Sequence, residues 1–288
     1  MTPLLAACRP RQWIKNGLVF LPLISSGSVG SPEAVRRSAI AAAAFILMSS
    51  AVYLVNDLAD RGADAGHPVK KRRPIPSGKL SRGTAASAAL VLGVGSLLIA
   101  LTLPGAVWSV LGFYAVSNIG YSAGLRQQPI LDVLMVSSGF VLRPVAGAWA
   151  IPVRVSAWLF VVSLLMSLTF ALLKRRAELT GLEERAGDHR PALGGYSVRF
   201  LDQLVAITAG AGIMSYALYT FQSEHSDSLV ATLPFFLYGV FRYLYLVYER
   251  GAGAAPEEIF LRDRPLQIAV VLYAATLAVV VKWFSSQP

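Results

Sequence analysis

Residues 56–78 read NDLADRGADAGHPVKKRRPIPSG, an acidic half followed by a basic half. The stretch follows one long apolar run, residues 39–55, and precedes another that begins at residue 85. Long apolar runs with few charges are typical of membrane-spanning helices. The charged stretch is therefore expected at the membrane surface, where it joins two such helices.

The acidic half has the spacing of a helical metal site. If the helix continues through residue 64, Asp57, Asp60 and Asp64 are spaced i, i+3, i+7, and Asn56, Asp60 and Asp64 are spaced i, i+4, i+8. Either set lies along one helix face. Oxygen ligands without Cys or His suit a hard cation such as Mg²⁺, which also binds substrate phosphates. All four residues are predicted metal ligands and the three aspartates are predicted catalytic residues, with the directly bound carboxylates left open.

The basic half supplies counter-charges for the same phosphates. Lys70, Arg72 and Arg73 follow the acidic residues closely, and such side chains bind phosphate oxygens with charge-assisted hydrogen bonds. Each half alone has an ordinary explanation, because acids cap helices and Lys/Arg runs beside membrane helices set topology. The combination of the two halves in a membrane context favours a functional site.

The composition indicates a polytopic α-helical membrane protein. The chain has 288 residues, of which 55% are hydrophobic and 15% charged, and its mean hydropathy is +0.56. The single cysteine, Cys8, excludes an intrachain disulfide framework and a cysteine-based metal site. The net charge is +10, and the positions of the basic residues along the chain are more informative than this total. No nucleic-acid partner is expected.

Nine membrane segments are predicted, of which the first is weak because it is short and contains Lys15 and Asn16. They span residues 13–29, 38–58, 83–103, 105–124, 130–151, 156–174, 200–221, 228–248 and 265–285. Most Lys and Arg residues lie at the N-terminus and in the loops after segments 2, 4, 6 and 8. Positive loops stay in the cytoplasm, so the N-terminus is predicted inside and the C-terminus outside.

Four cytoplasmic regions then contain most of the chemically capable side chains. They are residues 9–16 (RPRQWIKN), the stretch 56–78, residues 118–133 and residues 172–197. The third region offers Tyr121, Arg126 and Asp132, and the fourth begins with Lys174, Arg175, Arg176 and Glu178. We expect these regions to surround a central cavity that opens to the cytoplasmic side.

Two arginines lie inside apolar segments, Arg143 and Arg242. Ionisable residues within a membrane are costly and usually face a cavity or a partner. Arg143 is expected either to line the cavity or to pair with a buried carboxylate such as Asp132. Arg242 has the simpler option of extending its charge to the membrane surface.

The motifs resemble those of the UbiA superfamily of intramembrane prenyltransferases. NDLADRGAD, residues 56–64, matches its N-D-x-x-D-x-x-x-D motif, and nine helices match its architecture. Five further motifs resemble one branch of this superfamily, the decaprenyl-phosphate phosphoribosyltransferases. They are HPVKKRRPIPSG, RPRQWIKN, the Y-S-x-x-L-R segment, KRRAEL, and YGVFRYLYLVYERG with PEEIFLRDRPL. The match covers essentially the whole chain, which is predicted to be a single transferase domain, residues 1–288.

The chain departs from other UbiA proteins after segment 6. The second Asp-rich motif of aromatic prenyltransferases is absent, and KRRAELTGLEE, residues 174–184, stands in its place. An aromatic prenyltransferase would need a second acidic cluster, for which only Glu178, Glu183 and Glu184 are available. The branch usually has Lys at the position of Arg126, and Ala at the position of Pro144.

The resemblance implies transfer of 5-phosphoribose from phosphoribosyl pyrophosphate to a polyprenyl phosphate, with release of pyrophosphate. Mg²⁺ on the acidic face would neutralise the leaving pyrophosphate. The acceptor phosphate is already an anion, so no general base is required. The implied substrate-binding residues are Lys15 for the acceptor phosphate, and Lys70, Arg72, Arg73, Tyr121, Arg126, Lys174, Arg175 and Glu178.

The resemblance also implies a cellular location, a pathway and a possible assembly. It places the protein in the bacterial plasma membrane, in the synthesis of arabinose-type cell-envelope precursors, with assembly as a trimer as one option. The length and saturation of the polyprenyl chain are left open. Two alternatives are an aromatic prenyltransferase with a polyprenyl diphosphate donor and, from another class, a membrane transporter with Arg143 and Arg242 along its pathway. A purely structural membrane protein would not need the row of aspartates.

Overall fold

The computed structural model describes residues 2–66, 70–182, 191–222, 226–254 and 256–285, and these residues form helices and connecting turns without a β-strand. The long helices are α3 (Pro32–Ala59), α5 (Arg82–Ala100), α6 (Val107–Ala123), α7 (Leu131–Ala150), α8 (Ala157–Leu182), α10 (Val198–Gln222), α12 (Leu233–Tyr248) and α14 (Arg264–Ser285). The short α-helices are α1 (Pro3–Ala7), α2 (Leu21–Ser25), α4 (Arg61–Gly66), α11 (Ser226–Leu229) and α13 (Pro256–Arg262). The all-helical prediction is confirmed.

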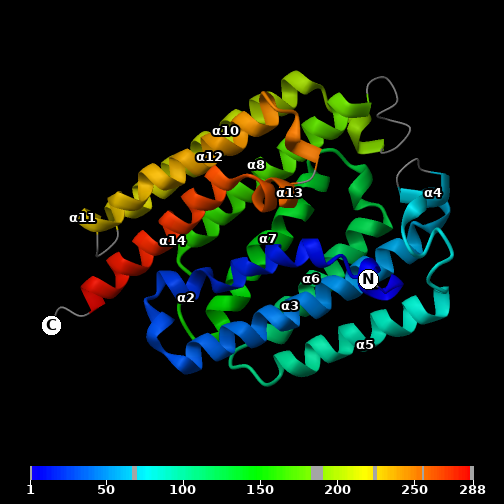
Figure 1. The fold of residues 1–288 in the computed structure, drawn as a ribbon, viewed down its shortest axis with the longest axis horizontal. Coiled ribbons are helices and arrows are strands. Elements are labelled where there is room, and N and C mark those ends of the chain that lie inside the picture. The colour runs from blue at the N-terminus through cyan, green and yellow to red at the C-terminus, as the bar shows by residue number, and fades with distance from the viewer. Residues whose placement is uncertain (1, 67–69, 183–190, 223–225, 255, 286–288) are drawn as a thin grey trace.

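The long helices pack as two groups. Helices α3, α5, α6 and α7 form one group, with Phe45, Leu111 and Tyr114 in its core. Helices α8, α10, α12 and α14 form most of the other, with Leu172, Leu201 and Tyr243 in its core. Helix α7 contacts both α6 and α8 and so joins the two groups (Figure 1).

Seven of the described helices are long and apolar enough to cross a membrane, by length and composition. They are α3, α5, α7, α8, α10, α14 and residues 230–248, which include α12. Helix α6 covers the predicted segment 105–124 but has 17 residues. The chain is thus a multi-span membrane protein.

The first predicted segment, 13–29, is not one α-helix. It consists of the 3₁₀ helix η1 (Pro10–Phe20), then α2, then the 3₁₀ helix η2 (Ser28–Gly30). This segment packs on α7 at Gly147, where a side chain would overlap the backbone carbonyl of Val19. A glycine on α7 therefore permits the close backbone approach that holds this irregular segment against the bundle.

The close contact at Gly147 makes a testable prediction. We expect Gly147→Ala to lower the thermal unfolding midpoint of detergent-purified protein, because overpacking costs about 1–3 kcal/mol. Gly95→Ala in α5 is the matched control, since a methyl group there meets nothing within 4 Å. Equal midpoints for the two variants would contradict the close approach of η1 and α7.

Candidate functional site

The acidic motif lies where α3 ends. The amide of Asp60 donates to the carbonyl of Asn56 at 2.9 Å, and the amide of Asp64 donates to the carbonyl of Asp60 at 2.8 Å. These are α-helical i→i−4 hydrogen bonds, so the helical register passes from α3 into α4. Helix α3 itself ends at Ala59 and α4 begins at Arg61, so the helical spacing is kept across a break at Asp60 rather than by one continuous helix.

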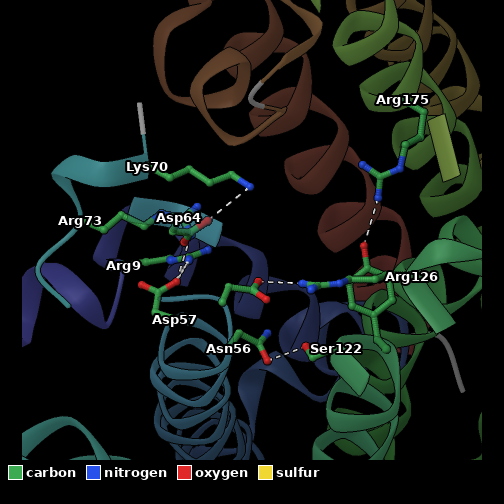
Figure 2. Close-up of polar contacts among 11 residues, drawn as sticks. Arg9, Asn56, Asp57, Asp64, Lys70, Arg73, Ser122, Arg126 and Arg175 are labelled. Carbon is green, nitrogen blue, oxygen red and sulfur yellow. Dashed lines mark hydrogen bonds and ion pairs between the residues drawn. The ribbon is translucent and has the colours of Figure 1, made fainter. Parts of the chain in front are cut away.

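Asn56 and Asp60 face the end of α6 and the turn that follows it. The Asn56 Oδ1 atom accepts a hydrogen bond from the Ser122 hydroxyl at 2.7 Å. Asp60 Oδ2 accepts from Arg126 Nη1, also at 2.7 Å, with Arg126 in the 3₁₀ helix η4 (Leu125–Gln127). This hydrogen bond raises the pKa of Arg126, so the guanidinium stays charged. Figure 2 shows the contact of Asn56 with Ser122, and Arg126 on the same side of α3.

Asp57 and Asp64 face the opposite way and share a different partner. Arg73 Nη1 donates to Asp57 Oδ1 at 3.1 Å and to Asp64 Oδ2 at 2.7 Å. Arg9 also donates to Asp57, and Lys70 Nζ lies 3.6 Å from Asp64 Oδ1 (Figure 2). The four acidic-motif residues therefore form two pairs, 56 with 60 and 57 with 64, rather than one row. The competing arginines on two sides of the helix are the reason.

The segment after the acidic motif folds back because its apolar residues are buried. Ile75 and Leu80 pack with Leu54 of α3 and with Ala7 and Cys8 of the N-terminal segment. This packing holds Arg73 beside the end of α3. Arg72, in the 3₁₀ helix η3 (Lys70–Arg72), is exposed, and His67 lies outside the described residues.

A second buried cluster centres on Arg175 of α8. Its guanidinium donates through Nε to Asp132 Oδ2 at 2.6 Å, through Nη1 to Glu178 at 2.7 Å, and through Nη2 to the Tyr121 hydroxyl at 3.2 Å. The Tyr196 hydroxyl donates to the other oxygen of Asp132 at 2.7 Å. Burial and this hydrogen bond raise the pKa of Tyr196, so its hydroxyl remains a donor. Tyr121, Arg175 and Glu178, which the sequence predicted as site residues, are thus brought together.

The basic residues of the fourth predicted region are helical rather than in a loop. Helix α8 continues to Leu182, so Lys174, Arg175 and Arg176 lie within it. Lys174 Nζ lies 4.0 Å from Glu178, and Arg176 donates to Asp202 at 2.6 Å. The prediction of a membrane segment ending at residue 174 was wrong about the helix end, and Glu183 and Glu184 lie outside the described residues.

Arg143 does not pair with Asp132, which is held by Arg175. The buried Arg143 donates to Asn16 Oδ1 at 2.8 Å and to the carbonyl of Gly139. Its guanidinium lies 5.2–5.6 Å from the ring centres of Phe45, Tyr114 and Phe140. Lys15 lies 5.7 Å from the Phe140 ring, so the structure places it beside this cluster on α7.

Arg242 has a partner close by. It donates to both carboxylate oxygens of Asp263, at 3.2 and 2.8 Å, and lies over the Tyr245 ring. Asp263, between α13 and α14, has its pKa lowered by the hydrogen bond from Arg242. The arginine thus joins α12 to the start of α14 and needs no cavity to accommodate its charge.

The oxygen chemistry of the acidic motif fits a hard cation, but its side chains are paired with cations of the protein. Among the described residues, no three His, Cys, Asp or Glu side chains are grouped as a metal site. Asp60 is the more accessible carboxylate, at 22% side-chain exposure, whereas Asp57 is at 2%. A divalent cation near Asn56 and Asp60 would therefore compete with Arg126 for Asp60.

The structure adds residues that the sequence alone did not indicate as site residues. Arg9, Ser122 and Tyr196 each contact a predicted site side chain or its partner. Arg9 belongs to the basic stretch 9–16, and its positive φ of 54° before Pro10 is uncommon for a non-glycine residue. The hydroxyls of Ser122 and Tyr196 have no comparable sequence signal.

The sequence and the fold of this chain have known counterparts. The model of the UbiA prenyltransferase family matches residues 19–262, and the chain belongs to that family. The chain is 36% identical to a decaprenyl-phosphate phosphoribosyltransferase from Corynebacterium glutamicum, across 96% of this chain and 86% of that protein. It is 34% identical to the protein of that name from Mycolicibacterium smegmatis, across 95% of this chain and 91% of the relative.

A solved structure has the same fold. It is that of a UbiA homolog from Archaeoglobus fulgidus bound to GPP and Mg²⁺, with a TM-score of 0.75. The comparison covers 97% of this chain and 99% of the homolog at 18% identity, so it shows the fold alone.

The Arg175 cluster yields a stability prediction. Asp132→Ala is expected to destabilise the protein by about 3–5 kcal/mol, because it leaves the buried Arg175 charge without this partner. Tyr196→Phe removes the hydrogen bond to the same carboxylate and the one that the hydroxyl accepts from the Ile130 amide, and is expected to cost about 1–2 kcal/mol. Denaturant titrations in detergent would measure both values, and an Asp132→Ala variant as stable as Tyr196→Phe would contradict the pairing.

Proposed function

We propose that the protein transfers 5-phosphoribose from phosphoribosyl pyrophosphate to a polyprenyl phosphate of the decaprenyl type. The observation that carries this proposal is the similarity to decaprenyl-phosphate phosphoribosyltransferases along nearly the entire chain. The gathering of acids and arginines from α3, η4 and α8 at one end of the bundle supports it. Such a site suits two phosphorylated substrates.

The donor would bind between the acidic motif and the basic side chains. Breaking the bond between C1 of the ribose and pyrophosphate leaves negative charge on the pyrophosphate. Arg126 forms an ion pair with Asp60 at 2.7 Å, and its guanidinium suits phosphate oxygens. The other proposed phosphate contacts are Lys70, Arg72, Arg73, Lys174 and Arg175. Arg175 would turn an Nη atom from Tyr121 or Glu178 to the phosphate while its Nε atom stays on Asp132.

Asn56 and Asp60 are proposed to hold Mg²⁺, which when bound neutralises charge on the pyrophosphate, and Asp64 would join them as a ligand on release from Arg73. A fold neighbour solved with Mg²⁺ supports a metal in this fold. Asp57 is proposed as a positioning residue, because its oxygen already accepts from Arg9 and Arg73. Its carboxylate fixes the N-terminal segment and the 70–80 loop against α3.

The acceptor phosphate oxygen would form the new bond to C1 of the ribose. It is an anion at neutral pH, so the site needs to orient it rather than remove a proton. Lys15 remains the proposed contact of the acceptor phosphate. Its position beside Phe140 would place that contact on the α7 side of the site.

The setting follows from the same proposal. The helix α6 and the η1–α2 segment, added to the seven long spans, would give nine crossings of a bacterial inner membrane. The expected central cavity and the paired charges would face the cytoplasm, with the N-terminus inside and the C-terminus outside. Residues 1–288 would act as one domain, alone or as a trimer, and the product would serve arabinose-type envelope precursors.

An aromatic prenyltransferase is the second candidate, favoured by the fold neighbour solved with GPP and Mg²⁺. That activity would use the same acidic motif for a prenyl diphosphate. The basic residues of α8, where a second acidic motif would be needed, favour the phosphoribosyl reaction. A transporter is less well supported, because Arg143 is enclosed by three aromatic rings.

The transfer reaction is directly testable. Purified protein supplied with labelled phosphoribosyl pyrophosphate, polyprenyl phosphate and Mg²⁺ is expected to move label into the lipid phase, and a chelator is expected to abolish transfer. Prenylation of an aromatic acid from a prenyl diphosphate, with no phosphoribosyl transfer, would overturn the proposal in favour of the second candidate.

The two acid pairs are expected to respond differently to substitution. Asp60→Asn should lower kcat by about 100-fold or more, since it removes a charge that acts on the reacting phosphates. Asp57→Asn should leave the Mg²⁺ concentration for half-maximal rate near that of the wild type and lower the thermal unfolding midpoint instead. A raised Mg²⁺ requirement in Asp57→Asn, measured by titrating the metal at fixed substrate, would show that Asp57 is a ligand.

A further inference from the structure

A groove runs along the outside of the first helix group. It is lined by α3 from Met48 to Asn56, by α5 from Ala89 to Leu97, and by Ala115 and Ile119 of α6. Its volume is about 250 Å³, and Asn56 is the sole polar side chain among its lining residues. The stretch of α3 that it follows is about 12 Å long, at 1.5 Å per residue.

Small residues on three helices create the groove. Ala51, Ala89, Gly93 and Ala115 lie in its walls, and a methyl group on Gly93 would lie 3.8 Å from the Ala51 side chain. The floor is buried, with Val52 at 4% exposure, whereas Leu90 at the rim is 67% exposed. The groove therefore opens outward between α5 and α6, toward the lipid.

One end of the groove meets the candidate site. Asn56 lines the groove and also accepts the hydrogen bond from Ser122. One helical turn beyond it, Asp60 is paired with Arg126. An apolar channel between membrane helices thus leads directly to a cluster of acids and arginines.

We propose that this groove holds the first isoprene units of the acceptor polyprenyl phosphate. The inference rests on the proposed function and adds the place of the lipid tail. A polyprenyl phosphate has an anionic phosphate at one end and an apolar chain behind it. The structure offers matching surroundings in the same order, with the cation Arg126 first, then the polar Asn56, and then the apolar groove. With the chain along α3, its phosphate would leave the groove beside Asn56, next to the donor at Asp60, and Lys15 would contact it from the α7 side.

The size of the groove limits what it holds. Pockets for whole drug-sized ligands are about 300–1,000 Å³, so this groove accommodates only the start of a long chain. The remainder would pass over the exposed rim between α5 and α6 into the bilayer. Gly93 would then be a residue that determines whether the chain fits.

The first test is photolabelling of the wild-type protein. A polyprenyl phosphate with a diazirine near its phosphate is expected to label residues 48–56, 89–97 or 115–119, which line the groove, and unlabelled polyprenyl phosphate should compete. Label on other helices would overturn the inference, as would equal competition by a phospholipid, which would indicate an ordinary bilayer lipid. Crosslinks between two copies of the chain through α5 and α6 would overturn it as well, by showing that a second copy covers the groove.

A pair of variants provides the kinetic test. Gly93→Leu is expected to raise the KM for polyprenyl phosphate by about tenfold and leave the KM for phosphoribosyl pyrophosphate within about twofold. Gly95→Leu, on the same helix but outside the groove, should change neither value. Equal KM values for polyprenyl phosphate in the two variants would overturn the inference.

The two proposals can fail separately. If the wild-type protein transfers no phosphoribose, the proposed function fails, while the photolabelling still decides whether a prenyl phosphate occupies the groove. If transfer occurs and label falls elsewhere, the function stands and the groove assignment fails. If Gly93→Leu does not fold, the labelling of the wild type remains decisive.

Discussion

The site depends on the cost of burying charge inside a membrane bundle. A buried charge in a protein is paired or bound to a metal, since an isolated one is too costly. Asp57, Asp64 and Asp132 have side-chain exposures of 3% or less, and each accepts from an arginine. Those arginines come from the N-terminal segment, from the 70–80 loop and from α8. Satisfying the carboxylates therefore draws segments far apart in sequence to one end of the bundle.

The sequence predicts the helices well because the bilayer dictates their length, but it predicts their ends poorly. Hydropathy marks where the membrane stops, not where the helix stops. Helix α8 continues past residue 174 through KRRAELTGL because these are mostly good helix formers, and because Arg175 and Glu178 pair at i, i+3. The prediction of a membrane helix over residues 13–29 is wrong for a different reason. The polar residues of this segment and its contact with Gly147 favour an irregular backbone path.

The sequence identifies the charged residues of the site but not their partners. Helical spacing alone places Asn56, Asp60 and Asp64 on one face, yet Asp64 shares Arg73 with Asp57. That choice depends on the burial of Ile75 and Leu80, which folds the loop back, and tertiary packing of this kind leaves no local pattern. Likewise, Asp132 pairs with Arg175 rather than with Arg143, because α8 lies against the start of α7.

The ion pairs of the site differ in what they are able to do. Separating Arg175 from Asp132, with side-chain exposures of 3% and 0%, would strand a buried charge at a cost of several kcal/mol. Arg126 and Asp60, at 32% and 22%, are partly solvated and separate at far lower cost. The first pair is thus suited to holding α8 and α7 in place, and the second to exchanging partners. Asp60 is accordingly the carboxylate best placed to meet a metal ion, and Arg126 the cation best placed to meet a phosphate. The buried pairs hold the helices that position these two side chains.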